Sequence, residues 1–287
     1  MNYRHAYHAG NFADVLKHAV LCRVLTYLRE KPAAFRVIDT HAGAGLYDLG
    51  AAEAGKTGEW RDGIGRLFNA KLEPGLRDLL APYLDAVAAA NPPDRLISYP
   101  GSPLLARSLL RWQDRLIACE LEPATGLALA RSLRGDARAK ALAIDGWTAL
   151  SAYVPPKERR GLVLVDPPFE EESDFRRLSH GLAVAHRKWA TGIYMLWYPI
   201  KDRGGPDALA KRLRRQTLAK ILRAELTVLP ISDASKLNGC GLILVNPPWK
   251  LADELAILLP ALAKNLGPQG KGTFRLDWLA GGAPAGR

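Results

Sequence analysis

The chain has 287 residues, of which 48% are hydrophobic, and 40 basic against 29 acidic side chains give it a formal net charge of +11. This length allows one large α/β domain or two small ones, and the hydrophobic fraction excludes a disordered chain. The basic excess favours a polyanionic partner, although net charge informs on association and not on fold.

The cysteines and the apolar runs indicate the compartment. Cys22, Cys119 and Cys240 are scattered, lie mostly within apolar runs and lack the spacing of a metal site. They are typical of buried thiols in a reducing compartment. The amino terminus lacks the apolar core of a signal peptide, and no apolar run approaches the ~18 residues of a membrane span. We therefore expect a cytoplasmic protein without a metal and without membrane contact.

Residues 1–31 predict an amino-terminal arm followed by a helix. The arm is dense in polar rings and has no periodicity. Asn11 can cap the helix, with Asp14 three residues later where a capping box usually has Glu. Apolar residues then recur at helical spacing, and Lys17 and His18 lie just off that stripe. The arm is either a frayed surface segment or a lid over a neighbouring site.

A first strand is predicted to end in Asp39 and to continue into a glycine-rich turn, residues 40–45. Glycines such as Gly43 allow a backbone to approach a ligand closely. Their spacing differs from the G-x-G-x-x-G of a dinucleotide-binding fold, so the turn alone is a weak signal. His41, inside the turn, is either a ligand contact or a polar residue at the sheet edge.

Residues from about 47 to 98 predict a small helical insertion. Apolar residues recur at helical spacing from Leu76 to Val87, and Pro82 should bend or break that helix. Ser102 is expected to cap the helix that follows the insertion. We expect the whole chain, 1–287, to form a single domain that carries this insertion.

The rest of the chain alternates strands with helices, which is typical of an α/β fold with a mainly parallel sheet. Four of the predicted strands end in an acidic residue, and these are Asp39, Glu120, Asp145 and Asp166. Right-handed crossovers bring the carboxyl ends of parallel strands to one edge, so the four acids should lie together. Such an edge favours a ligand that carries a positive charge, amines or hydroxyls. The strands near 221–229 and 241–246 predict a terminal antiparallel hairpin.

The strand Leu162–Asp166 continues directly into the sequence Pro-Pro-Phe, which ends at Phe169. The prolines end the strand because they cannot donate ladder hydrogen bonds. The Asp166 carboxylate, the Pro167 carbonyl and the aromatic ring can together hold a planar group that carries an exocyclic amine. An ordinary strand followed by a proline loop is the alternative interpretation.

Two further features have open interpretations. A second Pro-Pro turn, Asn246–Trp249, ends the terminal hairpin, and there we expect Asn246 to be structural. Basic residues gather mostly on one predicted helix, and these are Lys201, Arg203, Lys211, Arg212, Arg214, Arg215, Lys220 and Arg223. They form either a solvated helical face or a stripe that binds the phosphates of a nucleic acid.

The order of these motifs resembles class I S-adenosylmethionine-dependent methyltransferases. A glycine turn follows the first strand, acids follow the second and third, and Asp-Pro-Pro-aromatic follows the fourth. More narrowly, the chain resembles the bacterial 23S ribosomal RNA adenine-N6-methyltransferases of the RlmJ type. The segments that carry this resemblance are Tyr3–His5, His8–Asn11, Asp14–His18, Asp39–Gly45, Thr57–Glu59, Tyr99–Pro103 and Thr191–Tyr194. It implies a Rossmann-like methyltransferase sheet with a small helical insertion.

The resemblance also implies a cofactor, a substrate and a site. The cofactor would be S-adenosylmethionine, and the substrate would be an adenine of 23S ribosomal RNA, acted on by a monomer. The implied cofactor-binding residues are Lys17, His18, Asp39, His41, Gly43, Ser102, Glu120, Asp145, Gly146 and Asp166. In the arm, Tyr3, Arg4 and His5 would contact the target base, and Phe169, where the family more commonly has Tyr, would stack on it.

The implied catalytic residues are Asp166, Pro167 and Phe169. Adenine N6 is a poor nucleophile because its lone pair is conjugated into the ring. Acceptance of the N6 hydrogens by Asp166 and by the Pro167 carbonyl would favour a pyramidal nitrogen aimed at the methyl group.

Three other functions are the alternatives. A DNA adenine-N6-methyltransferase uses the same Asp-Pro-Pro-Phe chemistry but usually has a larger target-recognition region. A non-catalytic RNA-binding protein on this scaffold would lose the acids, which are all present. A nicotinamide oxidoreductase would need the G-x-G-x-x-G that is absent.

Overall fold

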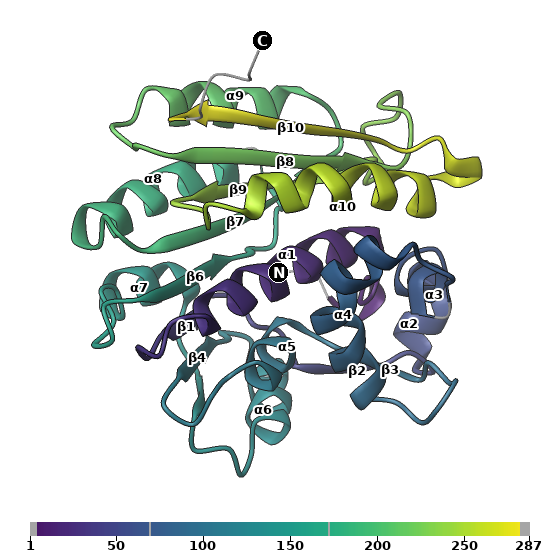
Figure 1. Cartoon of the computed structure of the whole chain (residues 1–287), viewed down its shortest axis with the longest axis horizontal. Coiled ribbons are helices and arrows are strands. Elements are labelled where there is room, and N and C mark those ends of the chain that lie inside the picture. Colours follow the sequence, from purple (N-terminus) through teal and green to yellow (C-terminus); the bar gives the residue numbers. More distant parts are fainter. Residues whose placement is uncertain (1–4, 69, 172, 282–287) are drawn as a thin grey trace.

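The computed structural model describes residues 5–68, 70–171 and 173–281 (Figure 1). Eight strands form one large sheet: β1 (Arg36–Asp39), β4 (Arg115–Cys119), β5 (Ala139–Leu142), β6 (Gly161–Val165), β7 (Ile193–Ile200), β8 (Ile221–Thr227), β9 (Gly239–Val245) and β10 (Thr273–Ala280). Their order across the sheet is β10-β8-β9-β7-β6-β1-β4-β5. A second, two-stranded sheet pairs β2 (Leu46–Asp48) with β3 (Ser98–Pro100).

The predicted fold class is confirmed. Strands β5, β4, β1, β6 and β7 pair in parallel in that order. Strand β9 pairs antiparallel with both β7 and β8, and β10 pairs antiparallel with β8. The sheet is therefore a Rossmann-like parallel half that continues into an antiparallel half, as the terminal hairpin predicted.

Helices cover both faces of the large sheet. The α-helices of the described residues are α1 (Phe12–Arg29), α2 (Ala52–Thr57), α3 (Ile64–Phe68), α4 (Pro74–Ala89), α5 (Ser102–Ser108), α6 (Pro123–Ser132), α7 (Gly146–Ala152), α8 (Ser173–Lys188), α9 (Gly204–Arg214) and α10 (Leu251–Leu266), of which α2 and α3 lie beside the sheet. Figure 1 shows α1 and α10 crossing in front of the sheet. Among the described residues, no helix is long and apolar enough to span a membrane.

Side-chain alternation along the strands builds a separate core on each face. In β6, Leu162 and Leu164 join the core that contains α1, α4 and α10, whereas Val163 and Val165 join the core that contains α8 and α9. Because both faces are apolar, all five residues of β6 are buried. This burial fixes the end of β6, and therefore Asp166, at the middle of the sheet edge.

The segment between β1 and β4 differs in part from expectation. We predicted only helices after the glycine turn, but the short strands β2 and β3 also pair there, with Leu46 opposite Pro100. Helix α4 runs unbroken through Pro82, so this proline does not break it. Figure 1 shows α2, α3 and α4 gathered at one side of the molecule near β2 and β3.

Helix α1 begins as the capping pattern predicts. The Asn11 side chain accepts hydrogen bonds from the backbone N–H groups of Ala13 and Asp14. Apolar contacts surround this helix on almost every side, so Lys17 and His18 are only 4% and 1% exposed. The prediction that both lie off the buried stripe was wrong. Two polar side chains on a buried helix need polar partners. Lys17 pairs with carboxylates in the site described next, and His18 lies 2.6 Å from the Tyr99 hydroxyl.

Candidate active site

A cavity of about 1670 Å³ lies at the carboxyl edge of the parallel strands. Glu120, Asp145 and Asp166 follow β4, β5 and β6, and all three line it. The parallel topology therefore brings these acids together as the sequence predicted. Asp39 ends β1 but is only 1% exposed and does not line the cavity. The cavity exceeds the usual size of a site for one small ligand, so it has room for a cofactor and a second group.

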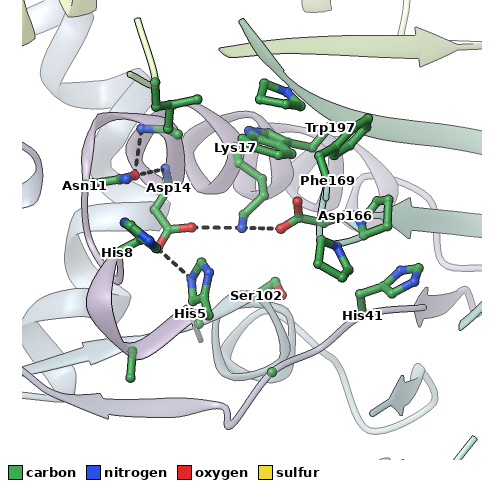
Figure 2. A pocket seen from close by; sticks show the side chains of 18 of the residues that line it. His5, His8, Asn11, Asp14, Lys17, His41, Ser102, Asp166, Phe169 and Trp197 are labelled. Carbon is green, nitrogen blue, oxygen red and sulfur yellow. Dashed lines mark hydrogen bonds and ion pairs between the residues drawn. The ribbon is translucent and has the colours of Figure 1, made fainter. Parts of the chain in front are cut away.

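A chain of ion pairs lies in the wall of this cavity (Figure 2). The Lys17 Nζ lies 2.8 Å from the Asp14 Oδ1 and 2.5 Å from the Asp166 Oδ2. Burial opposes the charge on Lys17, but the two carboxylates raise its pKa well above the usual value. Burial likewise opposes the charge on Asp14, yet Lys17 and the neighbouring histidines hold its pKa well below its usual value. Lys17 therefore stays protonated and forms an ion pair with one carboxylate oxygen of Asp166.

The other face of Asp166 is open to a ligand. Lys17 binds Oδ2, and no described residue donates a hydrogen bond to Oδ1. Pro167 is buried, and Phe169 projects beside Asp166 in Figure 2. The Phe169 ring lies 5.8 Å from that of Trp197 in a T-shaped arrangement and 4.9 Å from that of Phe175. These contacts set the ring at the cavity wall, where Phe169 and Trp197 both contribute to the lining.

The amino-terminal arm is fastened beside the cavity. The His8 ring and the Asn11 amide both bind the carboxylate of Glu59, at 3.0 Å and 2.9 Å. The His5 Nε2 lies 3.1 Å from the Asp14 Oδ2, so His5 reaches the ion-pair chain (Figure 2). Of the predicted substrate residues, only His5 and Phe169 can be located, since Tyr3 and Arg4 lie outside the described residues. The described part of the arm is therefore anchored and not frayed.

The glycine turn packs against Glu120. The Gly43 N–H donates to the Glu120 Oε2 at 3.0 Å, and the Glu122 N–H donates to Oε1 at 2.9 Å. Gly43 has a φ of 63°, and a Cβ there would lie 2.1 Å from the Tyr47 hydroxyl. Glycine is therefore required at this position by both conformation and space. Each Glu120 carboxylate oxygen accepts one of these hydrogen bonds, so Glu120 can still accept further hydrogen bonds from a ligand in the cavity.

Asp145 and Gly146 begin α7. The Asp145 carboxylate accepts from the Thr148 N–H at 2.9 Å and caps the helix. A Cβ on Gly146 would lie 2.2 Å from the Thr40 carbonyl, so this glycine lets α7 approach the first turn closely. The His41 ring lies 5.5 Å from that of Trp147, and burial lowers the His41 pKa to about 4. His41 is therefore neutral at physiological pH.

The prediction that Ser102 caps α5 was wrong. Gly101 occupies the cap position, and the Ser102 hydroxyl instead donates to the Asp39 Oδ2 at 2.6 Å. Burial raises the Asp39 pKa to about 7 despite this hydrogen bond, and its Oδ1 has no partner among the described residues. Ser102 lines the cavity and Asp39 lies behind it. Asp39 is therefore connected to the cavity through its hydrogen bond with Ser102.

Sequence reasoning missed several cavity residues. Trp147 and Trp197 line the cavity, and the Arg177 guanidinium lies 4.7 Å from the Trp147 ring centre. Trp197 faces Phe169 because β6 and β7 are neighbours, which the strand order could have indicated. Asp14 was recognised as a helix-start residue and as part of a family motif, but not as a residue of the cavity. Among the described residues, no group of three His, Cys, Asp or Glu side chains could hold a metal ion.

The basic residues between 201 and 223 do not form one stripe. Arg223 is buried in β8 and pairs with Asp277, and Arg203 pairs with Glu225. Strand β8 begins beside the end of β9, at the sheet edge opposite the cavity. Helix α9 directly precedes β8 in the chain, so the carboxyl end of α9 leads to that same edge. The exposed cations that lie there are Lys211, Arg214, Arg215 and Lys220.

Asn246 has the structural role that we expected. Its side-chain amide donates to the carbonyls of Ala190 and Gly192 at 2.7 Å and 2.8 Å. Val245 pairs with Tyr194 near the start of β7, so this second Pro-Pro turn also lies at the edge opposite the cavity.

Comparison with known proteins identifies the family. A family model described as RsmJ, "Ribosomal RNA large subunit methyltransferase D, RlmJ", matches residues 32–280. The chain is 42% identical over 279 residues to Ribosomal RNA large subunit methyltransferase J of Escherichia coli (strain K12), covering 97% of this chain and 99% of that protein. The chain belongs to the ribosomal RNA large subunit methyltransferase J family. The resemblance stated from the motifs is therefore confirmed.

A further relative and a solved structure agree with this assignment. The Haemophilus influenzae protein of the same name is 39% identical over 280 residues, with 97% of this chain and 99% of that protein covered. A Legionella pneumophila protein of known structure is 32% identical, with a TM-score of 0.86 over 94% of this chain and 98% of that one. The fold shared with that structure thus extends over nearly the whole chain.

Proposed function

We propose that the protein transfers a methyl group from S-adenosylmethionine to N6 of an adenine in 23S ribosomal RNA. Membership of a ribosomal RNA methyltransferase family supports this proposal. The observation that carries it is the sequence Asp166-Pro-Pro-Phe169 at the end of β6, where the Asp166 Oδ1 has no donor among the described residues and faces a large cavity. This arrangement has the acceptors and the ring that an exocyclic amine on a planar base requires.

The cavity residues fit S-adenosylmethionine. Glu120 retains acceptor capacity for ribose hydroxyls, and the carboxylates along the sheet edge complement a positively charged ligand. The His18 Nε2 is buried without a hydrogen-bond partner and could bind a carboxylate. The residues that would hold the cofactor are Lys17, His18, Asp39, His41, Gly43, Ser102, Glu120, Asp145, Gly146 and Asp166. Of these, Asp39 would act through Ser102. When bound, the cofactor supplies a methyl group activated by a positively charged sulfur.

The protein's own groups would position the target amine. Asp166 Oδ1 and the Pro167 carbonyl each accept one N6 hydrogen, and this directs the nitrogen lone pair away from both acceptors. Lys17 holds Asp166 by its other oxygen, so the acceptor is fixed before the base arrives. Because Lys17 is protonated, it cannot take the proton that N6 releases, and Asp166 or water accepts it.

Aromatic and arm residues would receive the flipped-out base. Stacking on the Phe169 ring contributes about 1–3 kcal/mol and partly offsets the cost of unstacking. His5 lies on the ion-pair chain and lines the cavity, which supports its contact with the target base. The proposed contacts of Tyr3 and Arg4 with that base rest on the family resemblance, since both lie outside the described residues. The position of His5 thus supports the proposal that the arm covers the target base.

We also propose that the chain acts as a single cytoplasmic domain, residues 1–287, and as a monomer. Leu80 and Tyr83 of α4 pack in the same hydrophobic core as α1, which supports one domain that includes the segment from about 47 to 98.

Methyl transfer to purified RNA tests this proposal. The protein is incubated with S-adenosylmethionine and either a deproteinised 23S ribosomal RNA transcript or duplex DNA. Incorporation into the RNA alone supports the proposal. Incorporation into DNA alone would assign a DNA adenine methyltransferase instead, and incorporation into neither, despite cofactor binding, would refute both substrates.

A further inference from the structure

A fully buried hydrogen-bond chain leads from α4 to the cavity. The His18 Nδ1 lies 2.6 Å from the Tyr99 hydroxyl, which lies 2.9 Å from the Tyr83 hydroxyl. The His18 and Tyr99 rings are stacked with centres 5.6 Å apart. The three side chains are at most 1% exposed and come from α1, β3 and α4. The segment between β1 and β4 thus reaches the cofactor side of the cavity through these hydroxyls.

The other ring nitrogen of His18 has no partner. The Nε2 is buried, and the Asp14 Oδ1 is 3.8 Å away, too far for a hydrogen bond. Asp14 and His18 both line the cavity, so the Nε2 edge of the ring, beside Asp14, lies at the cavity wall and is covered in the cofactor-free protein. A buried polar nitrogen without a partner is costly unless a ligand satisfies it.

The surroundings decide which nitrogen carries the proton. Burial lowers the His18 pKa well below its usual value, and Lys17 and His5 lower it further while Asp14 raises it, so the ring is neutral. Burial also raises the pKa values of both tyrosines well above the usual value, so both remain hydroxyl donors. With Nε2 unprotonated, its lone pair would face the Asp14 carboxylate and be repelled. With Nε2 protonated, Tyr83 donates to Tyr99 and Tyr99 donates to Nδ1.

We propose that Tyr99, supported by Tyr83, is a positioning residue that fixes His18 as the Nε2–H tautomer, so that His18 presents a hydrogen-bond donor to an acceptor oxygen of the bound cofactor. This inference rests on the proposed function only for the identity of the ligand. It gives the segment between β1 and β4 a role in cofactor binding, although neither tyrosine lines the cavity. The same chain explains why both hydroxyls are kept in an apolar core.

The tautomer can be read without cofactor or RNA. Long-range proton–nitrogen correlation spectra of the ¹⁵N-histidine-labelled protein distinguish the two neutral forms, and the His18→Gln variant identifies the signals among the six histidines. We expect the Nε2–H form in the wild type and loss of that single form in Tyr99→Phe. A wild-type Nδ1–H form would overturn the inference.

Cofactor titration by calorimetry supplies the second readout. Tyr99→Phe should raise the dissociation constant for S-adenosylmethionine about five- to tenfold, and Tyr83→Phe by a smaller factor. Tyr194→Phe is the matched control, because Tyr194 is fully buried and its hydroxyl donates to the Trp189 carbonyl away from the cavity. It should lose comparable stability but bind the cofactor normally. Equal affinities for Tyr99→Phe and Tyr194→Phe would overturn the inference.

These outcomes separate the inference from the proposed function. A wild type that does not bind S-adenosylmethionine would refute the proposed cofactor, and the tautomer of His18 would still decide the role of Tyr99.

Discussion

The Lys17 ammonium lies 2.5 Å from the Asp166 carboxylate and joins the buried helix α1 to the end of β6. The same ammonium lies 2.8 Å from Asp14, so one cation faces two carboxylates. The contact bridges residues that are 149 positions apart in the chain. The Lys17–Asp166 contact therefore links the stability of the fold to the position of the Asp166 carboxylate, which we propose as the hydrogen-bond acceptor for the target amine.

Replacement of Lys17 by Met should destabilise the protein by about 3–5 kcal/mol, because two mostly buried carboxylates lose their partner. Urea unfolding measures this loss. Lys250→Met is the matched control, since Lys250 pairs with Glu30 at the surface and should cost less than about 1 kcal/mol. Equal losses for the two variants would show that the buried ion pairs do not stabilise the fold.

Phe169→Ala should weaken RNA capture more than cofactor binding. Loss of one stacking surface predicts a decrease in RNA affinity of about tenfold or more, while calorimetric affinity for S-adenosylmethionine stays within about twofold. Single-turnover rates at increasing RNA concentration measure the first effect. Trp249→Ala, at the second Pro-Pro turn, removes a 78%-exposed ring on the opposite edge and should change neither quantity. The assignment fails if Phe169→Ala behaves like this control.

Asp39 should make the cofactor-free protein less stable as pH rises. An unfolded Asp ionises near pH 3.9, whereas burial raises the folded Asp39 pKa to about 7. Between these values the unfolded chain releases a proton that the folded chain keeps, so stability falls with rising pH, by a total on the order of 4 kcal/mol.

Asp39→Asn should remove this decline. The unfolding free energy of the variant minus that of the wild type should therefore increase between about pH 4 and pH 8, as measured by urea titration at several pH values. Asp62→Asn, whose carboxylate is largely exposed, should keep a nearly constant difference. Parallel curves for wild type and Asp39→Asn would contradict the assigned pKa.

Phosphate contacts should come from the cavity rim and not from the end of α9. Lys201 and Lys236 are exposed and line the cavity. Their joint replacement by Ala should reduce the slope of log affinity against log salt by about one to two units. The control replaces four residues at the far edge: Lys211, Arg212, Arg214 and Arg215. A larger loss of slope in that control would restore the phosphate-binding interpretation of the helix.

Local patterns predicted most of the fold because they depend on neighbouring residues. The apolar run before Asp166 is buried on both faces, and the two prolines end it, so both the strand and its end were readable. The edge that gathers Glu120, Asp145 and Asp166 followed from strand–helix alternation alone.

Contacts between distant residues were not readable in the same way. Ser102 fits the sequence pattern of a helix cap, but its hydroxyl instead donates a hydrogen bond to Asp39, 63 positions away in the chain. Strands β2 and β3 have three residues each and carry too little pattern to predict their pairing. Arg223 fitted the pattern of a basic stripe, but its side chain donates a hydrogen bond to Asp277 on β10, 54 positions later in the chain.

The most direct test is nucleoside mass spectrometry of 23S ribosomal RNA after incubation with S-adenosylmethionine and either the wild type or Asp166→Ala. The variant should stay folded because Lys17 keeps its contact with Asp14, which circular dichroism can check. We predict N6-methyladenosine at one site with the wild type and none with the variant. A different methylated nucleoside from the wild type, or near-normal turnover by Asp166→Ala, would contradict the account.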